Sequence, residues 1–79
     1  MRIQLSEVCG LKHIRPGGVI YFIKTNETFY FDEDTFLVIQ IFNRDIIDLE
    51  KIKLDGYEKE ELKEFFQGLL DSGIYSEVR

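Results

Sequence analysis

The residues best suited to chemistry in this sequence are its one cysteine and its one histidine, which stand four positions apart. Cys9 and His13 could in principle form a thiolate–imidazole pair of the kind used in nucleophilic catalysis. Neither residue belongs to a recognisable motif, and no third group stands ready to orient the imidazole. We therefore expect the spacing to be incidental, with Cys9 acting as a small, half-buried hydrophobic residue.

Two short motifs could bind ligands, but each fits a structural role better. The run Asp32-Glu33-Asp34 could ligate Mg²⁺ or Ca²⁺, yet it lacks the spaced pattern of a calcium loop and suits the start of a helix. Gly17-Gly18 follows Arg15-Pro16, and no Gly-Lys-Ser/Thr sequence of a phosphate-binding loop comes after it. It predicts a turn instead. We expect no metal, no cofactor and no catalytic activity.

Aromatic residues crowd two neighbouring segments, Tyr21-Phe22 and Phe29-Tyr30-Phe31. They could stack nucleic-acid bases, but the sheets that do so are ringed by Lys and Arg, and only Lys24 lies close in sequence. In a strand, Tyr30 must face away from Phe29 and Phe31. One face of the sheet is thus expected to be apolar and exposed, which favours a protein or peptide partner.

A β-hairpin is expected to carry these aromatic residues. Residues 19–24 and 29–31 are rich in β-branched and aromatic side chains, and Asn26 between them suits a left-handed turn position. Residues 35–42 could form a strand or a helix. The lack of alternation and the preceding acidic residues favour a helix that ends near Asn43.

Two further helices are expected in the second half of the chain. Residues 48–54 suit a short helix capped by Asp48 and ended by Asp55-Gly56. Residues 58–72 form the clearest element, because Leu and Phe recur there at helical spacing, and Gly73 marks its end.

Composition places the chain among small folded domains. Its 79 residues are 44% hydrophobic, which is enough for one core, and predict a single domain over residues 1–79. The net charge of −5 disfavours nucleic acids and anionic membranes as partners. A single cysteine fits a cytoplasmic location, and no segment has the pattern of a signal peptide or a membrane span.

From about residue 19 to residue 77, the chain resembles the PqqD-like domains, the recognition elements of pathways that make ribosomally synthesised, post-translationally modified peptides. Residues 29–35, Phe-Tyr-Phe-Asp-Glu-Asp-Thr, and residues 61–74, Glu-Leu-Lys-Glu-Phe-Phe-Gln-Gly-Leu-Leu-Asp-Ser-Gly-Ile, carry the likeness. The resemblance implies an α+β, winged-helix-like fold, with an N-terminal three-stranded antiparallel sheet followed by three helices. The stretch 44–57 is short for the family's second helix and its loops.

The resemblance also implies a site. The leader region of a precursor peptide would add as a strand beside Thr28, Phe29, Tyr30 and Phe31, against a helix wall of Leu62, Lys63, Phe66, Gln67 and Leu70. Lys63 would pair with an acidic leader residue, and Phe66→Glu would block the groove. The partner enzyme would be a peptide-modifying enzyme such as a radical maturase. The chain would be either a free-standing recognition protein or a domain of a larger maturase.

The sequence leaves three other functions open. A winged-helix DNA-binding protein would need basic residues at the phosphates, whereas the long helix carries Glu58, Glu60, Glu61 and Glu64. A small adaptor or inhibitor that binds another protein fits the composition equally well. An enzyme fits least, for want of any catalytic constellation.

Overall fold

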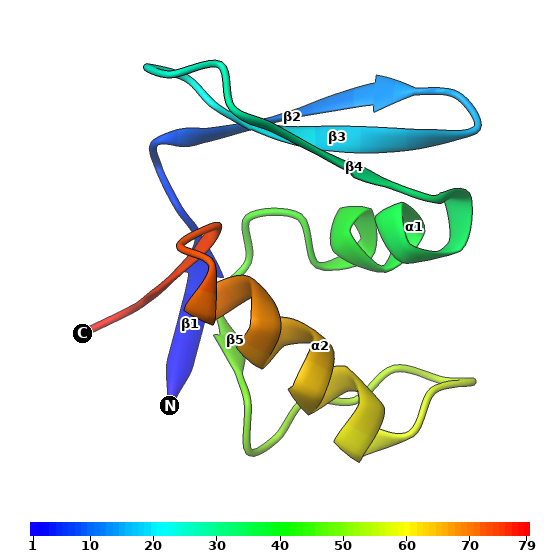
Figure 1. Ribbon diagram of the computed structural model, residues 1–79. Helices are drawn as coiled ribbons and strands as arrows, with labels where there is room; N and C mark the ends of the chain where they lie inside the picture. The colour runs from blue at the N-terminus through cyan, green and yellow to red at the C-terminus, as the bar shows by residue number, and fades with distance from the viewer. The chain divides into compact units, whose positions relative to one another are not determined.

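The computed structural model describes every residue from Met1 to Arg79, and the chain divides into two compact units. Unit 1 comprises Met1–Ser6 together with Arg44–Arg79, and unit 2 comprises Glu7–Asn43. Six strands and two helices follow one another along the chain (Figure 1). Their bounds are β1 Arg2–Leu5, β2 Cys9–Ile14, β3 Gly17–Phe22, β4 Thr28–Phe31, α1 Glu33–Phe42, β5 Ile47–Asp48, α2 Lys59–Asp71 and β6 Tyr75–Glu77.

Unit 2 is an antiparallel sheet of strand order β2-β3-β4, followed by α1. The expected hairpin is confirmed: β3 and β4 pair with Ile20 opposite Phe29, and Asn26 adopts a left-handed conformation with φ 60°. The Asn26 N–H donates to the Phe22 carbonyl at 2.8 Å, and the Phe22 N–H donates to the Glu27 carbonyl at 2.8 Å. These two bonds close the turn and set the register of the hairpin.

Helix α1 begins where the acidic run predicted. The Asp32 carboxylate accepts a 2.8 Å hydrogen bond from the Thr35 N–H and caps the helix, while Glu33 and Asp34 occupy its first turn. The helix ends at Asn43, whose φ is 48° and whose N–H donates to the Ile39 carbonyl. The prediction of a helix rather than a strand over this apolar run is confirmed.

The two consecutive glycines lie in β3 and not in the turn that precedes it. A Cβ at Gly17 would overlap the main-chain carbonyl of Phe31, and a Cβ at Gly18 would overlap the Phe36 ring. The glycines therefore let β4 and α1 approach β3 closely. The predicted turn is present, but it comprises Arg15 and Pro16, and the two glycines belong to the strand that follows. The Arg15–Pro16 peptide bond is cis.

Unit 1 holds a second antiparallel sheet, in which β1 lies between β5 and β6. Ile3 pairs with Ile47 on one side and with Glu77 on the other, and Leu5 pairs with Tyr75. The side chains of Ile3, Leu5 and Tyr75 are buried. Alternate residues of β1 thus supply one half of the core of this unit.

Helix α2 supplies the other half. Leu62, Phe66 and Leu69 recur at helical spacing and are buried, and the Phe66 ring meets the Tyr75 ring edge-on, with centroids 5.4 Å apart. The helix ends in a Schellman motif, because Gly73 has φ 85° and the N–H groups of Gly73 and Ile74 donate to the carbonyls of Leu70 and Leu69. The expected stop at Gly73 is confirmed.

The predicted fold class is wrong in two respects. The chain is α+β, but it contains two three-stranded sheets rather than one, and two helices rather than three. The winged-helix-like arrangement of one sheet followed by three helices is therefore overturned. Neither helix is long and apolar enough to cross a membrane.

The missing helix is the one expected over residues 48–54. The Asp48 carboxylate accepts a hydrogen bond from the Glu50 N–H at 3.0 Å, as a helix cap would, and the Lys51 N–H donates to the Asp48 carbonyl. The helical turn is not continued, because Ile47 and Asp48 pair with β1 and because Leu49 and Ile52 are buried. Tertiary burial therefore overrides the local helical preference.

Candidate functional site

Strand β4 forms one edge of the sheet in unit 2, and its only strand neighbour is β3. In antiparallel pairs, residues alternate between those whose main-chain groups bond the partner strand and those whose groups point away. Because the Phe22 N–H bonds the Glu27 carbonyl, the pairs formed by Phe29 and Phe31 are hydrogen-bonded ones. The N–H and C=O groups of Thr28 and Tyr30 consequently point outward from the edge.

The side chains of β4 divide between the two faces of the sheet. Phe29 and Phe31 are half-buried on the face against which α1 packs, and Phe29 meets Phe22 edge-on with centroids 6.0 Å apart. Tyr30 lies on the opposite face and is 57% exposed. The prediction that Tyr30 would face away from its two neighbours is confirmed.

The face that carries Tyr30 is mixed in character. On β2 and β3 the residues of this face are Gly10, Lys12, Ile14, Gly17, Val19 and Tyr21. In unit 2, α1 covers only the opposite face, where Phe36 meets Gly18. Among the apolar side chains of the face that carries Tyr30, Ile14 and Tyr30 are exposed, Tyr21 is half-buried and Val19 is buried.

Exposed carboxylates stand at both ends of β4. Glu27 precedes the strand, and Asp32, Glu33 and Asp34 follow it. The hydrogen bond from the Thr35 main chain and, to a smaller extent, that from the Thr35 side chain hold the pKa of Asp32 below its usual value. The charge of this capping carboxylate is therefore retained at neutral pH, and none of the four acids forms an ion pair within unit 2.

The remaining predicted site residues lie on α2, in unit 1, whereas Thr28–Phe31 belong to unit 2. Phe66 is fully buried against Tyr75, Leu62 is also buried, and Gln67 is exposed. Phe66→Glu would bury a charge in the core of unit 1, so this variant would report on stability and not on peptide binding. A role for the α2 residues as the wall of a peptide groove stays a prediction.

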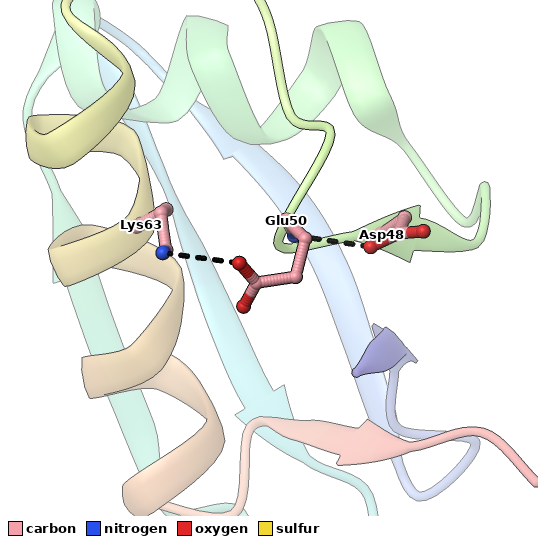
Figure 2. Close-up of polar contacts among 3 residues, drawn as sticks. All are labelled: Asp48, Glu50 and Lys63. Atoms are coloured by element: carbon pink, nitrogen blue, oxygen red, sulfur yellow. Dashed lines mark hydrogen bonds and ion pairs between the residues drawn. The ribbon is translucent and has the colours of Figure 1, made fainter.

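Lys63 has a carboxylate partner within its own unit. Its Nζ lies 3.5 Å from Oε2 of Glu50, and Figure 2 shows the two side chains reaching toward each other from α2 and from the turn after β5. The Glu50 N–H is in turn bonded to Asp48. Sequence reasoning missed Glu50, because the segment was expected to be helical. The two residues help to line a depression of about 470 Å³.

The two residues considered for catalysis are held apart. Cys9 and His13 lie on the same strand, where four residues span about 13 Å, so a thiolate–imidazole contact is excluded. Cys9 is fully buried rather than half-buried. The His13 ring instead meets the Phe36 ring edge-on, with centroids 5.7 Å apart, and its Nδ1 lies 3.4 Å from Nε2 of Gln40. These residues line an open depression of about 680 Å³.

Tyr75 carries the one buried side-chain polar atom without a hydrogen-bond partner, its hydroxyl oxygen. An unsatisfied buried hydroxyl costs about 1–3 kcal/mol. We expect Tyr75→Phe to raise the free energy of unfolding by about 1 kcal/mol in urea denaturation at pH 7. The exposed Tyr57→Phe serves as the matched control and should leave it unchanged; a loss of stability in Tyr75→Phe would mean that the hydroxyl is satisfied in solution.

The same hydroxyl should make the fold sensitive to alkali. Burial raises the pKa of Tyr75 from its usual 10.0 to about 12, although Arg44 acts weakly in the opposite direction. The unfolded chain therefore loses this proton first. The contribution of Tyr75 to stability is complete below pH 10 and is lost between pH 10 and pH 12, by roughly 2–3 kcal/mol. Tyr75→Phe should remove this part of the alkaline loss.

What sequence reasoning could not supply is the direction of the main-chain groups on β4. Thr28 and Tyr30 were named through the resemblance to PqqD-like domains, but the hydrogen-bond phase of the hairpin is what turns their N–H and C=O groups outward. The left-handed Asn26 was the one available signal, since the turn fixes that phase.

No protein-family model, curated protein or solved structure matches the chain.

Proposed function

We propose that this chain binds an extended peptide, which adds as a strand to the free edge of β4. The peptide is the leader region of a ribosomally synthesised precursor, and the chain presents it to a modifying enzyme such as a radical maturase. The observation that carries the proposal is the outward direction of the Thr28 and Tyr30 main-chain groups on an edge strand. A cytoplasmic location belongs to the same proposal.

An open edge of this kind is suited to strand addition. Main-chain hydrogen bonds to the edge give affinity, and alternate side chains of the added strand give selectivity. Beside β4, one set of peptide side chains would lie next to Tyr30 and the other next to Phe29 and Phe31. Apolar peptide residues fit both environments, because all three neighbours are aromatic. The resemblance of residues 29–35 and 61–74 to PqqD-like domains supports a leader peptide as the source of that strand.

The direct test is an amide NMR titration of the labelled chain with leader peptides encoded beside its gene. We expect chemical-shift changes at Thr28–Phe31 and slower hydrogen exchange at the amides of Thr28 and Tyr30. Duplex DNA is the control and should produce no change. Changes confined to residues outside unit 2 would contradict addition at β4, and changes with DNA alone would favour a nucleic-acid function.

A pair of variants at Tyr30 isolates the main-chain contribution. Tyr30→Pro removes an N–H that β3 does not use, so the sheet should survive, as edge strands tolerate proline at such positions. We expect it to weaken leader binding at least tenfold, since one hydrogen bond is lost and the added strand meets the proline ring. Tyr30→Ala removes the same aromatic ring but keeps the N–H, and should weaken binding less. Titration by fluorescence anisotropy with a labelled peptide would measure both.

Equal effects of Tyr30→Pro and Tyr30→Ala would show that the ring, and not the main chain, binds the peptide. Circular dichroism spectra of the two variants establish beforehand that each is folded. Phe29→Pro is the informative contrast, because the Phe29 N–H belongs to a hydrogen-bonded pair with Ile20 and its loss should unfold unit 2.

A further inference from the structure

The two ends of β4 carry charge of one sign. Glu27 stands immediately before the strand, and Asp32, Glu33 and Asp34 stand immediately after it. All four side chains are exposed, and the Asp32 carboxylate keeps its charge by capping α1. Unit 2 has three cations: Lys24 in the hairpin turn, Lys12 on β2, and Arg15, which lines the depression beside Glu33 without forming an ion pair to it.

An added strand would be bracketed by these carboxylates. The four residues of β4 span about 13 Å, so a peptide strand of the same length places its first and last residues near Glu27 at one end and near residues 32–34 at the other. Between those ends the edge offers only Thr28, Phe29, Tyr30 and Phe31. The edge is thus an apolar stretch enclosed by negative charge.

We infer that the peptide which adds to β4 has an apolar middle of about four residues with lysine or arginine at both ends. This inference rests on the proposed strand addition and names the chemical class of peptide that the edge selects. Opposite charges at the rim of an interface speed association and suppress wrong partners, and like charges there are costly. Acidic peptides of the same apolar pattern would be rejected by Glu27 and Asp34, whatever their capacity to form strands.

The test compares two synthetic peptides with one shared four-residue apolar core, Lys-Lys-Val-Ile-Val-Ile-Lys-Lys and Glu-Glu-Val-Ile-Val-Ile-Glu-Glu. Each is titrated into the labelled chain, and the amide shifts of Thr28–Phe31 are followed at low and at high salt. We expect the lysine peptide to bind at least tenfold more tightly at low salt, because several exposed ion pairs each contribute up to a few-fold. The difference should shrink as salt screens these charges.

Charge variants locate the effect. Glu27→Gln combined with Asp34→Asn removes one carboxylate from each end of β4 while leaving the Asp32 cap in place, and should remove most of the preference for lysine. Glu7→Gln is the control, because Glu7 precedes β2, which lies two strands away from β4 across the sheet. It should retain the full preference.

The outcomes separate the two proposals. Binding of neither the two synthetic peptides nor any leader peptide at β4 would overturn strand addition itself, and the inference with it. Equal binding of the two synthetic peptides, or tighter binding of the glutamate peptide, would overturn the inference and leave strand addition standing. A preference for lysine that survives Glu27→Gln with Asp34→Asn, or that disappears in Glu7→Gln, would also overturn it.

Discussion

Replacement of Phe66 by alanine is expected to lower the free energy of unfolding by about 3–5 kcal/mol. The Phe66 side chain is fully buried in unit 1, and its ring meets the rings of Phe65 and Tyr75 edge-on, with centroids 5.1 Å and 5.4 Å away. Truncation to alanine removes both ring contacts and leaves a cavity in the core of unit 1. Urea denaturation followed by circular dichroism measures the loss.

The neighbouring Phe65→Ala provides the matched control. Phe65 is half-buried, so its truncation removes the same atoms from a site that solvent already reaches, and should cost about 1 kcal/mol. A chain of 79 residues has a total stability of only about 4–12 kcal/mol, so Phe66→Ala should remove a large part of it. Similar losses in the two variants would contradict the packing described for unit 1.

Gly17→Ala is expected to destabilise the chain by about 3 kcal/mol, although it adds a single methyl group. The new Cβ would overlap the carbonyl oxygen of Phe31, a main-chain atom that no side-chain rotation can move. Strand β4 would have to leave β3 at that end, and the Asp32 cap of α1 follows directly after Phe31. We expect amide exchange at Phe31 and through the first turn of α1 to become faster, as NMR would show.

Gly68→Ala makes the same chemical change at a site of opposite character. Gly68 lies within α2, where an added Cβ meets no atom within 4 Å, and alanine favours the helix by about 1 kcal/mol over glycine. The two substitutions should therefore shift the denaturation midpoint in opposite directions. A stabilised Gly17→Ala would show that β3 and β4 are further apart in solution than described.

Local sequence patterns predicted α1, α2 and the hairpin because their signals are carried by residues close together in the sequence. Asp32 caps α1 through a residue three positions away, Gly73 ends α2, and Asn26 sits in the turn between β3 and β4. In each case the deciding contact lies within one turn of the chain. Such contacts can be predicted from the sequence without knowledge of the fold.

The sheet of unit 1 could not be predicted in the same way. Its strands come from the beginning, the middle and the end of the sequence, and β5 is only two residues long. Nothing local marks Ile47 as the partner of Ile3, so the helical preference of residues 48–54 dominated the prediction. The winged-helix expectation failed at this point, because it needed a second helix where the chain instead pairs with β1.

The site shows the same division. The choice of Thr28–Phe31 followed from the resemblance to PqqD-like domains, whereas the opposite facing of Tyr30 followed from alternation along one strand, which the structure retains. The surroundings of the α2 residues depend on contacts distant in sequence: the Glu50 partner of Lys63 comes from the turn after β5, and the burial of Phe66 depends on β6. Composition shows which of these side chains are apolar or charged, but it does not show which of them are buried in the core.

The position of β1 has a kinetic consequence. Ile3 finds its partner Glu77 almost at the other end of the chain, and the Val78 N–H donates to the Arg2 carbonyl. The entropy of closing a loop grows with its length, and topologies dominated by such distant contacts fold slowly. Unit 2, in contrast, is one continuous stretch of sequence closed by hairpins. Because the contacts of unit 2 join residues close together in the sequence, we expect the β4 edge to form rapidly. The sheet around β1 should form more slowly, because it requires β6 from the other end of the chain.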